Sequence, residues 1–364
     1  MSATHKHSPL LEVHRRLGAR IVNFAGWDMP LQFSGVVAEH RAVRGEVGVF
    51  DVSHLGKLRV SGAGAGTALQ EALTADVLGL EIGRASYSLV LTESGGCIDD
   101  VFVYRRGNDE WLVVPNAANT DAVGAAIASS AGRVVDEWDR WAILAIQGPA
   151  SFELFERVFP GTGATDLALH EFRDLDVLGE TGMVARTGYT GERGFELYAP
   201  WSVAPKAFDE LLAAGGTPVG LGARDTLRLE MGYALYGHEL TLEVSPLEAG
   251  LGWVLAWDTP FRGRDACRRI KEEGPARRLF GISCRERGVP RQHHRVLGSE
   301  DSDQSAIGEV TSGNFSPTLN TGIALALGER ARVPEEGSEV AIEARGRRIR
   351  GDIVKPPFVK RSRG

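Results

Sequence analysis

Apolar residues recur along the chain at two spacings, which predicts a mixture of helices and strands. A spacing of three to four residues predicts helices over residues 9–17, 39–48, 67–73, 117–130, 151–159, 201–214 and 222–231. Runs rich in β-branched and aromatic residues predict strands within 19–30, 57–61, 86–104, 110–116, 141–146 and 174–198. Two successive cycles of strands and helices are typical of an α+β protein.

The C-terminal part of the chain has a different pattern. Short strand-like segments at 279–284, 307–310, 322–327, 339–342 and 347–354 are separated by Gly, Pro and Asn. Such spacing predicts a small β-barrel or sandwich. An Arg-rich stretch, 258–278, precedes these segments, and we place the main domain boundary near Pro275.

Residues 86–104 predict a β-hairpin with two carboxylates just past its turn. Two apolar runs flank Glu93-Ser94-Gly95-Gly96, and Asp99 and Asp100 begin the second strand. Asp is depleted in strands, so the pair is either the solvated end of a turn or a catalytic carboxylate held on a strand. Side chains on a strand alternate faces, so only one of the two can look into a site. We expect Asp100 to share a face with Phe102 and Tyr104, and Asp99 to point away.

Composition and charge exclude several classes of protein. The 43% hydrophobic and 24% charged residues are typical of a soluble globular protein. The net charge of −7 does not favour binding to nucleic acid, because domains that bind nucleic acid are usually basic. The longest apolar runs, such as 141–146, are too short to span a membrane. The N-terminus has no apolar signal region, which favours a cytoplasmic protein. The large excess of Arg over Lys favours a GC-rich bacterial genome.

Conventional motifs for metal or covalent chemistry are missing from the sequence. Cys97, Cys267 and Cys284 form no C-x-x-C pair, and we expect buried, reduced thiols. The adjacent pair His293-His294 lacks the spacing of metal ligands. The glycines at 62–66 imitate a dinucleotide-binding turn, but the last glycine of that fingerprint is replaced by Thr67.

A second predicted hairpin, residues 186–198, concentrates polar and flexible residues. Its glycines allow close approach of a flat ligand, Tyr189 could cover a ring, and Glu196 could accept two parallel N–H donors. A polar hairpin tip in water explains the same residues equally well. Arg224, on the helix predicted at 222–231, could form an ion pair with a neighbour or bind a carbonyl or carboxylate group.

Assembled in order, these stretches resemble the aminomethyltransferase (T-protein) family of the glycine cleavage system. The resemblance runs from about residue 10 to 361. Its motifs are Asn23-Phe-Ala-Gly-Trp-Asp-Met-Pro30, Glu39-His40 through Arg44, Phe50-Asp-Val-Ser-His54, Gly95-Gly-Cys-Ile-Asp-Asp100, Gln147-Gly-Pro149, Thr187-Gly-Tyr-Thr-Gly-Glu192, Gly222-Ala-Arg-Asp-Thr-Leu-Arg-Leu-Glu230, Leu235-Tyr-Gly237, Ser245-Pro-Leu247 and Thr311-Ser-Gly-Asn-Phe-Ser-Pro-Thr-Leu319.

The resemblance implies a fold and its division into domains. It implies an α+β, three-domain cloverleaf with a central channel, made of two α+β subdomains and a C-terminal β-barrel. Residues 1–276 would form the folate-binding region, with 1–52 and 140–276 in one subdomain and 53–139 in the other. Residues 277–364 would form the barrel.

The resemblance also implies an activity. The family moves the one-carbon unit of an aminomethyl group on the lipoyl arm of H-protein to tetrahydrofolate, releasing ammonia. Tetrahydrofolate would be a co-substrate, with no metal and no covalent cofactor. H-protein would be the direct partner, and P-protein and L-protein functional partners, with no nucleic acid or membrane. The alternatives are a folate-dependent demethylase, or a folate-binding assembly factor whose K-G-C-[YF]-x-G-Q-E signature is missing here.

Site residues follow from the resemblance by position. Asp100 would be the catalytic carboxylate, acting as a base or as an electrostatic anchor. The positions expected to line the folate are Tyr87, Val114, Asn116, Tyr189, Glu196, Arg224 and, as the weakest match, Arg361.

Overall fold

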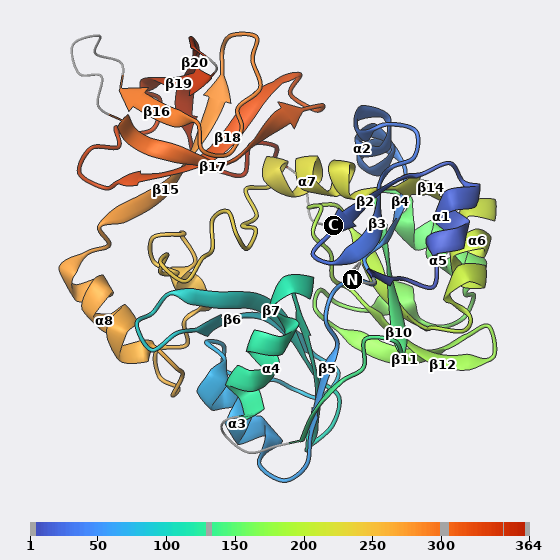
Figure 1. The fold of residues 1–364 in the computed structure, drawn as a ribbon. Coiled ribbons are helices and arrows are strands. Elements are labelled where there is room, and N and C mark those ends of the chain that lie inside the picture. The colour runs from blue at the N-terminus through green and yellow to red at the C-terminus, as the bar shows by residue number, and fades with distance from the viewer. Residues whose placement is uncertain (1–4, 129–132, 299–305, 345, 361–364) are drawn as a thin grey trace. The chain divides into compact units, whose positions relative to one another are not determined.

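A computed structural model describes residues 5–128, 133–298, 306–344 and 346–360 of the chain (Figure 1). Contacts between Cα atoms divide these residues into two compact units. The first unit contains the described residues up to Ser88 and those from Val101 to Asp225. The second unit contains Leu89–Asp100 and the described residues from Thr226 onward.

The first unit is built on a six-stranded sheet in the order β11-β12-β13-β10-β4-β14. Its central strands β10 and β13 pair antiparallel in the register Leu144↔Leu197. They are buried along their whole length, which explains the nearly continuous apolar run at 141–146. The strands are β4 (Gly48–Asp51), β10 (Trp141–Gln147), β11 (Phe172–Val177), β12 (Glu180–Ala185), β13 (Gly194–Pro200) and β14 (Thr217–Val219).

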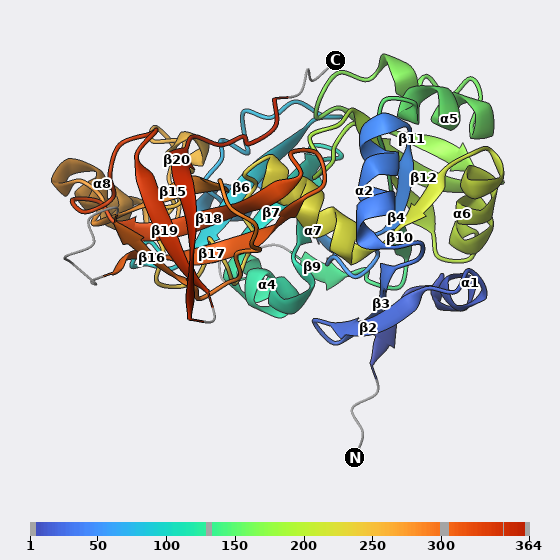
Figure 2. The ribbon, with the colours of Figure 1, turned by 90° about the horizontal axis from the view of Figure 1, so that it is seen from above.

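Helices α5 (Ser151–Val158) and α6 (Ala204–Ala213) lie beside this sheet (Figure 2). Their residues Phe155 and Phe208 share one core with Leu144 and Leu197, and this face of the sheet is therefore apolar. Side chains alternate along a strand, so the neighbours of Leu197 in sequence, Glu196 among them, belong to the other face. The fold thus separates a packing face from a polar face on β13.

The N-terminal segment forms a three-stranded sheet, β1-β3-β2, and two helices. The strand predicted at 19–30 is in fact a hairpin, β2 (Arg20–Phe24) and β3 (Trp27–Gln32). Ala25 and Gly26 both have positive φ, 50° and 81°, as required at the two central positions of a tight hairpin turn. The remaining elements are β1 (Lys6–His7), α1 (Leu11–Arg16) and α2 (Val36–Gly45).

A five-stranded sheet has the order β6-β7-β8-β5-β9. The predicted hairpin is confirmed as β6 (Ala85–Leu91) and β7 (Cys97–Arg105), with its turn closed by a hydrogen bond from Thr92 N to Gly96 O at 2.8 Å. The hairpin tip, Leu89–Asp100, groups with the second unit. The other elements of this region are β5 (Leu58–Ser61), α3 (Ala65–Ala72), β8 (Glu110–Pro115), η1 (Ala117–Asn119), α4 (Thr120–Ala128) and β9 (Arg133–Asp136); η2 (Ala164–Asp166) follows α5.

The second unit contains a closed six-stranded barrel in the order β15-β18-β17-β16-β19-β20, drawn in orange and red in Figure 1. Closure of the ring decides between the barrel and the sandwich that the sequence left open. Its interior is apolar, with Phe280, Ile282, Val310, Ile342 and Ile353 all buried. The strands are β15 (Arg277–Cys284), β16 (Arg295–Gly298), β17 (Ala306–Ser316), β18 (Thr321–Glu329), β19 (Glu339–Ala344) and β20 (Arg347–Val354).

Three further elements connect the sheets to the barrel. Helix α7 (Leu221–Glu230) runs from the first unit into the second, followed by η3 (Gly252–Val254) and α8 (Arg264–Glu273). The sequence pattern predicted α7 but not α8, because charged residues conceal its apolar positions Ala266 and Cys267. The predicted α+β class with a C-terminal barrel is confirmed, whereas the subdivision of residues 1–276 stays a prediction.

Candidate active site

Asp99 and Asp100 differ in their surroundings, as strand alternation predicts. Both lie in β7, where fully buried positions alternate with half-buried ones. Asp99 is completely buried on the face of Cys97 and Val101, and Asp100 is half-buried on the face of Phe102. The carboxylate that points away from the expected site is therefore the more deeply buried one.

Two of the predicted folate residues gather around Phe102. The ring of Tyr87, on β6, lies 5.8 Å from the ring of Phe102. Val114, on β8, is the register partner of Phe102, so their side chains share a face of the sheet. Because Asp100 precedes Phe102 by two residues on the same strand, this face presents an aromatic and aliphatic surface next to a carboxylate.

Glu196 is a buried carboxylate on the polar face of β13. It pairs in register with Ala145 and is only 9% exposed. The hydroxyl of Thr187 donates to its Oε2 at 2.5 Å. Burial raises the pKa of Glu196, against the hydrogen bond from Thr187 and the charge of Arg224, which both lower it. Such a group binds a pair of N–H donors strongly, because they compensate its lost hydration.

Two tyrosines extend this network and were not among the residues predicted to line the folate. Tyr198 donates to the hydroxyl oxygen of Tyr104 at 3.0 Å, and the Tyr104 hydroxyl lies 3.5 Å from that of Thr187. Burial raises the pKa of both phenols, so they stay neutral donors. Tyr104 shares a strand face with Asp100, as strand alternation predicts. Tyr198 is connected to it only by the tertiary fold.

Arg224 and Tyr189 come together although they are 35 positions apart in sequence. The guanidinium carbon of Arg224 lies 4.8 Å from the centre of the Tyr189 ring. The same guanidinium charge acts on Glu196 and on His54. Burial, followed by the charges of Arg224 and Lys57, lowers the pKa of His54 to about 3, with Asp51 opposing. The charge of Arg224 therefore acts both on a neutral imidazole and on a buried carboxylate.

The loop that carries Tyr189 is held by buried polar contacts. Arg44 donates to the Thr190 carbonyl at 2.7 Å and pairs with Glu192 at 2.9 Å. Gln147 accepts from the Thr190 hydroxyl at 2.8 Å and donates to the Thr187 carbonyl at 3.1 Å. A Cβ atom at Gly188 would clash with the Gln147 side chain, which explains a glycine there.

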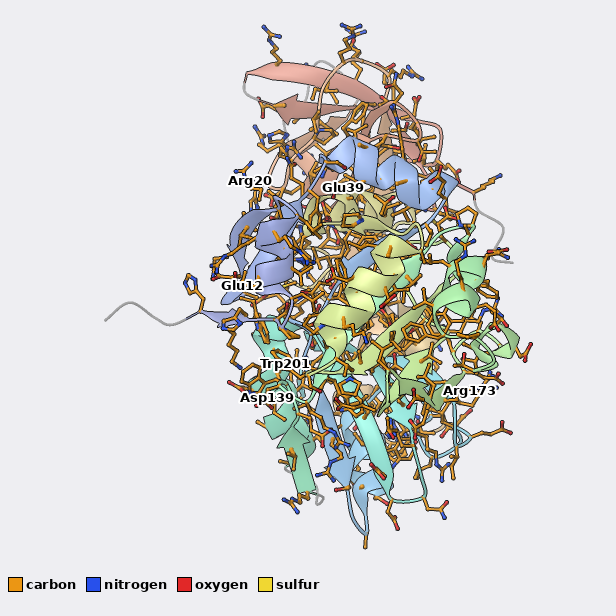
Figure 3. All side chains as sticks on the ribbon, turned by 90° about the vertical axis from the view of Figure 1, so that its right-hand side faces the viewer. Glu12, Arg20, Glu39, Asp139, Arg173 and Trp201 are labelled. Atoms are coloured by element: carbon orange, nitrogen blue, oxygen red, sulfur yellow. The ribbon has the colours of Figure 1, made fainter. Side chains whose placement is uncertain are left out.

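Glu39, which lies on α2 and is labelled in Figure 3, connects the segment before α2 to the segment before α7. Its carboxylate accepts hydrogen bonds from the backbone N–H groups of Phe33, Ser34 and Gly35 at 2.6, 2.8 and 2.9 Å. A fourth N–H, that of Gly220, donates at 2.9 Å directly before α7. Glu39 is thus a structural carboxylate that fixes the start of the helix bearing Arg224.

Two predicted residues remain to be placed. Asn116 follows β8 and is half-buried at the start of η1, where its carbonyl accepts from Asn119 N at 3.0 Å. Arg361 lies outside the described residues.

Metal binding, membrane insertion and the state of the cysteines can be assessed in the described part of the chain. There, no group of three or more His, Cys, Asp or Glu residues is arranged to hold a metal ion. None of the helices at described positions is long and apolar enough to cross a membrane. The three cysteines are buried free thiols, as expected.

Comparison with known proteins gives matches along almost the whole chain. The family model described as the GCVT N-terminal domain matches residues 10–259, and that of the glycine cleavage T-protein C-terminal barrel domain matches 277–360. The aminomethyltransferase of Parafrankia sp. (strain EAN1pec) is 46% identical, with 98% of each chain covered. That of Mycobacterium bovis is also 46% identical, covering 97% of this chain and 96% of its own.

A solved structure agrees with these sequence matches. The crystal structure of glycine cleavage system aminomethyltransferase T from Bartonella henselae superimposes with a TM-score of 0.89 at 33% identity, covering 97% of this chain and 98% of that one. Fold and matches together define the protein as a transferase with a C-terminal β-barrel. The chain belongs to the glycine cleavage T-protein family of aminomethyltransferases, and it is an enzyme of glycine catabolism.

Proposed function

We propose that the protein transfers the one-carbon unit of the aminomethyl group on lipoylated H-protein to tetrahydrofolate. The products are 5,10-methylenetetrahydrofolate, ammonia and dihydrolipoyl H-protein. The observation that carries the folate part is the convergence of Glu196, Arg224 and Tyr189. A buried carboxylate, a guanidinium and an aromatic ring suit the N–H groups, the carbonyl group and the flat face of a pterin.

The proposed reaction balances without an oxidant or a metal. The carbon to be moved lies between a sulfur and a protonated nitrogen. Its bonds to nitrogen and to sulfur break, and bonds to N5 and N10 of tetrahydrofolate form. The two N–H protons of the folate pass to the departing sulfur and to ammonia, which leaves as ammonium. H-protein is thereby the direct partner, and P-protein and L-protein of the same system supply the donor and reoxidise the carrier.

Asp100 is the proposed catalytic residue. Its carboxylate, on the rim of β7, would stabilise the cationic carbon that develops when ammonia leaves, and would help to move the folate proton. Tyr87, Val114 and Asn116 would line the folate next to it, and Arg361 is a further folate-lining candidate by its position in the sequence alone. Positioning of two large substrates would supply much of the remaining rate enhancement.

The decisive assay combines glycine, P-protein, lipoylated H-protein and tetrahydrofolate with this chain. We expect ammonia release and 5,10-methylenetetrahydrofolate formation that depend on the chain. Binding of tetrahydrofolate without any turnover would contradict the proposed donor and would favour a folate-dependent demethylase. Absence of folate binding would contradict the proposal altogether.

Asp100→Asn tests the proposed catalytic role. We expect the affinity for tetrahydrofolate to stay within about tenfold, while the transfer rate falls at least ~100-fold, the usual scale for one acid–base or electrostatic group. Asp99→Asn is the neighbouring control, and its folded fraction should transfer at a rate within about tenfold of the wild type. Turnover by Asp100→Asn close to that of the wild type would remove Asp100 from the mechanism.

A further inference from the structure

Within the second unit, the turn of the β6–β7 hairpin packs directly on the backbone of residues 241 and 242. The Cys97 N–H donates to the Thr241 carbonyl at 2.9 Å. Beside it, a Cβ atom at Gly96 would clash with the carbonyl oxygen and carbonyl carbon of Leu242. The contact is made by backbone atoms on both sides, and this leaves the two segments little freedom to move apart.

The other side of the same turn packs on the start of α8. The Cβ position of Gly95 is 3.3 Å from both Ala266 Cβ and Cys267 Sγ. A Cβ atom at Gly263 would clash with the Thr92 carbonyl oxygen. The turn that leads into Asp99 and Asp100 is therefore held from two directions.

Residues 235–242, which we call the clamp loop, are anchored by one carboxylate. Glu239 has a completely buried side chain and accepts from Leu235 N at 3.0 Å, within the loop itself. Its other donors are the Thr311 hydroxyl on β17, at 2.5 Å, and the Arg228 guanidinium on α7, at 3.2 Å. One carboxylate thus ties the loop to a barrel strand and a helix, two residues before the carbonyl that binds Cys97.

Arg228 completes the anchor from the helix side. Its guanidinium is 2% exposed and donates to the Tyr233 carbonyl at 3.1 Å and to the Ser312 hydroxyl at 2.8 Å. The desolvation of a buried ion pair offsets much of its attraction, so the pair adds little to stability. Its hydrogen bonds nevertheless fix the positions of the groups that they connect. Tyr236, on the clamp loop, has a pKa raised by burial and, next, by the charge of Asp99.

We propose that Glu239 is a positioning residue for the transfer reaction: through the clamp loop it fixes the hairpin turn and thereby the carboxylate of Asp100. The proposal rests on the proposed catalytic role of Asp100. Glu239 itself has no part in the chemistry. A shift of Asp100 by about 1 Å is enough to cost on the order of 100-fold in rate, whereas ground-state binding of a large ligand through other groups changes little.

Glu239→Gln is the first test, because glutamine keeps the size but removes the negative charge that pairs with the buried Arg228 guanidinium. We expect kcat to fall at least about tenfold, with the dissociation constant for tetrahydrofolate within about threefold of the wild type. Hydrogen exchange of the amides at 94–99 should become faster.

Glu230→Gln is the matched control in the same unit. Glu230 is as deeply buried and likewise accepts from a hydroxyl, that of Ser316 at 2.5 Å, and from the Thr318 N–H, at 3.2 Å. These partners belong to the β17–β18 turn and not to the clamp loop. We expect a comparable loss of stability in Glu230→Gln with kcat within about threefold of the wild type.

Gly96→Ala tests the other end of the same connection. The added methyl group pushes the turn away from Leu242, so kcat should fall at least about tenfold, whereas Leu242→Ala, which leaves the backbone contact intact, should not change it. If both ends act through one contact, the double variant Gly96→Ala/Glu239→Gln should lower kcat by a clearly smaller factor than the product of the two factors measured for the single variants.

The outcomes separate this proposal from the proposed function. An active wild type with an unchanged kcat in Glu239→Gln overturns the positioning role and leaves the function intact. Equal losses of kcat in Glu239→Gln and Glu230→Gln also overturn it, because stability alone then explains both. An inactive wild type contradicts the proposed function, while the hydrogen exchange of residues 94–99 still reports on the clamp.

Discussion

The guanidinium of Arg224 lies over the ring of Tyr189, 4.8 Å from its centre. The two residues come from α7 and from the loop between β12 and β13, and both are half-buried. A cation–π contact orients the planar guanidinium, and a guanidinium oriented in this way can present a fixed set of N–H donors. This arrangement makes the pair a measurable part of the proposed folate site.

Tyr189→Leu should weaken tetrahydrofolate binding about 5- to 30-fold, which corresponds to ~1–2 kcal/mol for loss of the stacking face and of the orientation of Arg224. Isothermal titration calorimetry measures the change. Phe152→Leu is the control, because Arg193 lies at the same 4.8 Å from that ring in a contact with no proposed ligand. Equal affinities of Tyr189→Leu and wild type would show that this ring does not contact the folate.

Glu196→Gln should weaken folate binding and yet stabilise the free protein at neutral pH. Burial raises the pKa of Glu196 above its value in the unfolded chain, about 4.5. The folded state then holds the proton more tightly, so this group's contribution to stability falls as the pH rises through the raised pKa. The variant should have a higher Tm than the wild type at pH 8, with a smaller difference at pH 4.5.

Glu12→Gln is the control for that comparison, since Glu12 is exposed on α1 and should shift Tm little at either pH. A Glu196→Gln variant that is less stable than the wild type at pH 8 would show that the Thr187 hydrogen bond outweighs the cost of the buried charge.

Asp51→Asn should destabilise the first unit at neutral pH by about 1–3 kcal/mol, because an amide accepts fewer hydrogen bonds than the buried carboxylate and leaves one of its donors unpaired. The Asp51 carboxylate lies 2.8 Å from His14 Nε2 and accepts from the Ser8 hydroxyl at 2.5 Å and from Ser53 N at 2.9 Å. Burial would raise its pKa, but the hydrogen bond and charge of His14 prevail and lower it to about 2.

The sign of the pH dependence follows from the lowered pKa. The contribution of Asp51 to stability is present above its unfolded pKa, 3.8, and is lost as the pH falls toward about 2. Urea unfolding between pH 2 and 6 should show this loss in the wild type but not in Asp51→Asn. Asp209→Asn removes an exposed ion pair with Arg16 and should leave the profile unchanged. If the stability of Asp51→Asn fell between pH 6 and pH 2 as much as that of the wild type, Asp51 would not be the group responsible for this loss.

Most helices and several strands could be predicted from local sequence patterns. The Glu93–Gly96 turn, the helices from α1 to α7 and the strand that contains Asp99 and Asp100 follow from spacing, glycine positions and β-branched runs, which depend on neighbours in sequence. The predictions failed where the signal was tertiary. Strand β14, of three residues, is defined by its parallel pairing with β4, and α8 by the apolar residues that it packs inward.

For the candidate site, strand alternation alone predicts that one aspartate of the pair faces the same side as Phe102, because alternation is a local property. The full burial of Asp99, and the link from Tyr198 through Tyr104 to Thr187 and Glu196, depend on tertiary packing. Only the tertiary structure placed the Arg224 guanidinium over the Tyr189 ring. Burial, charge–charge proximity and the resulting pKa shifts arise between segments far apart in sequence, and no local pattern encodes them.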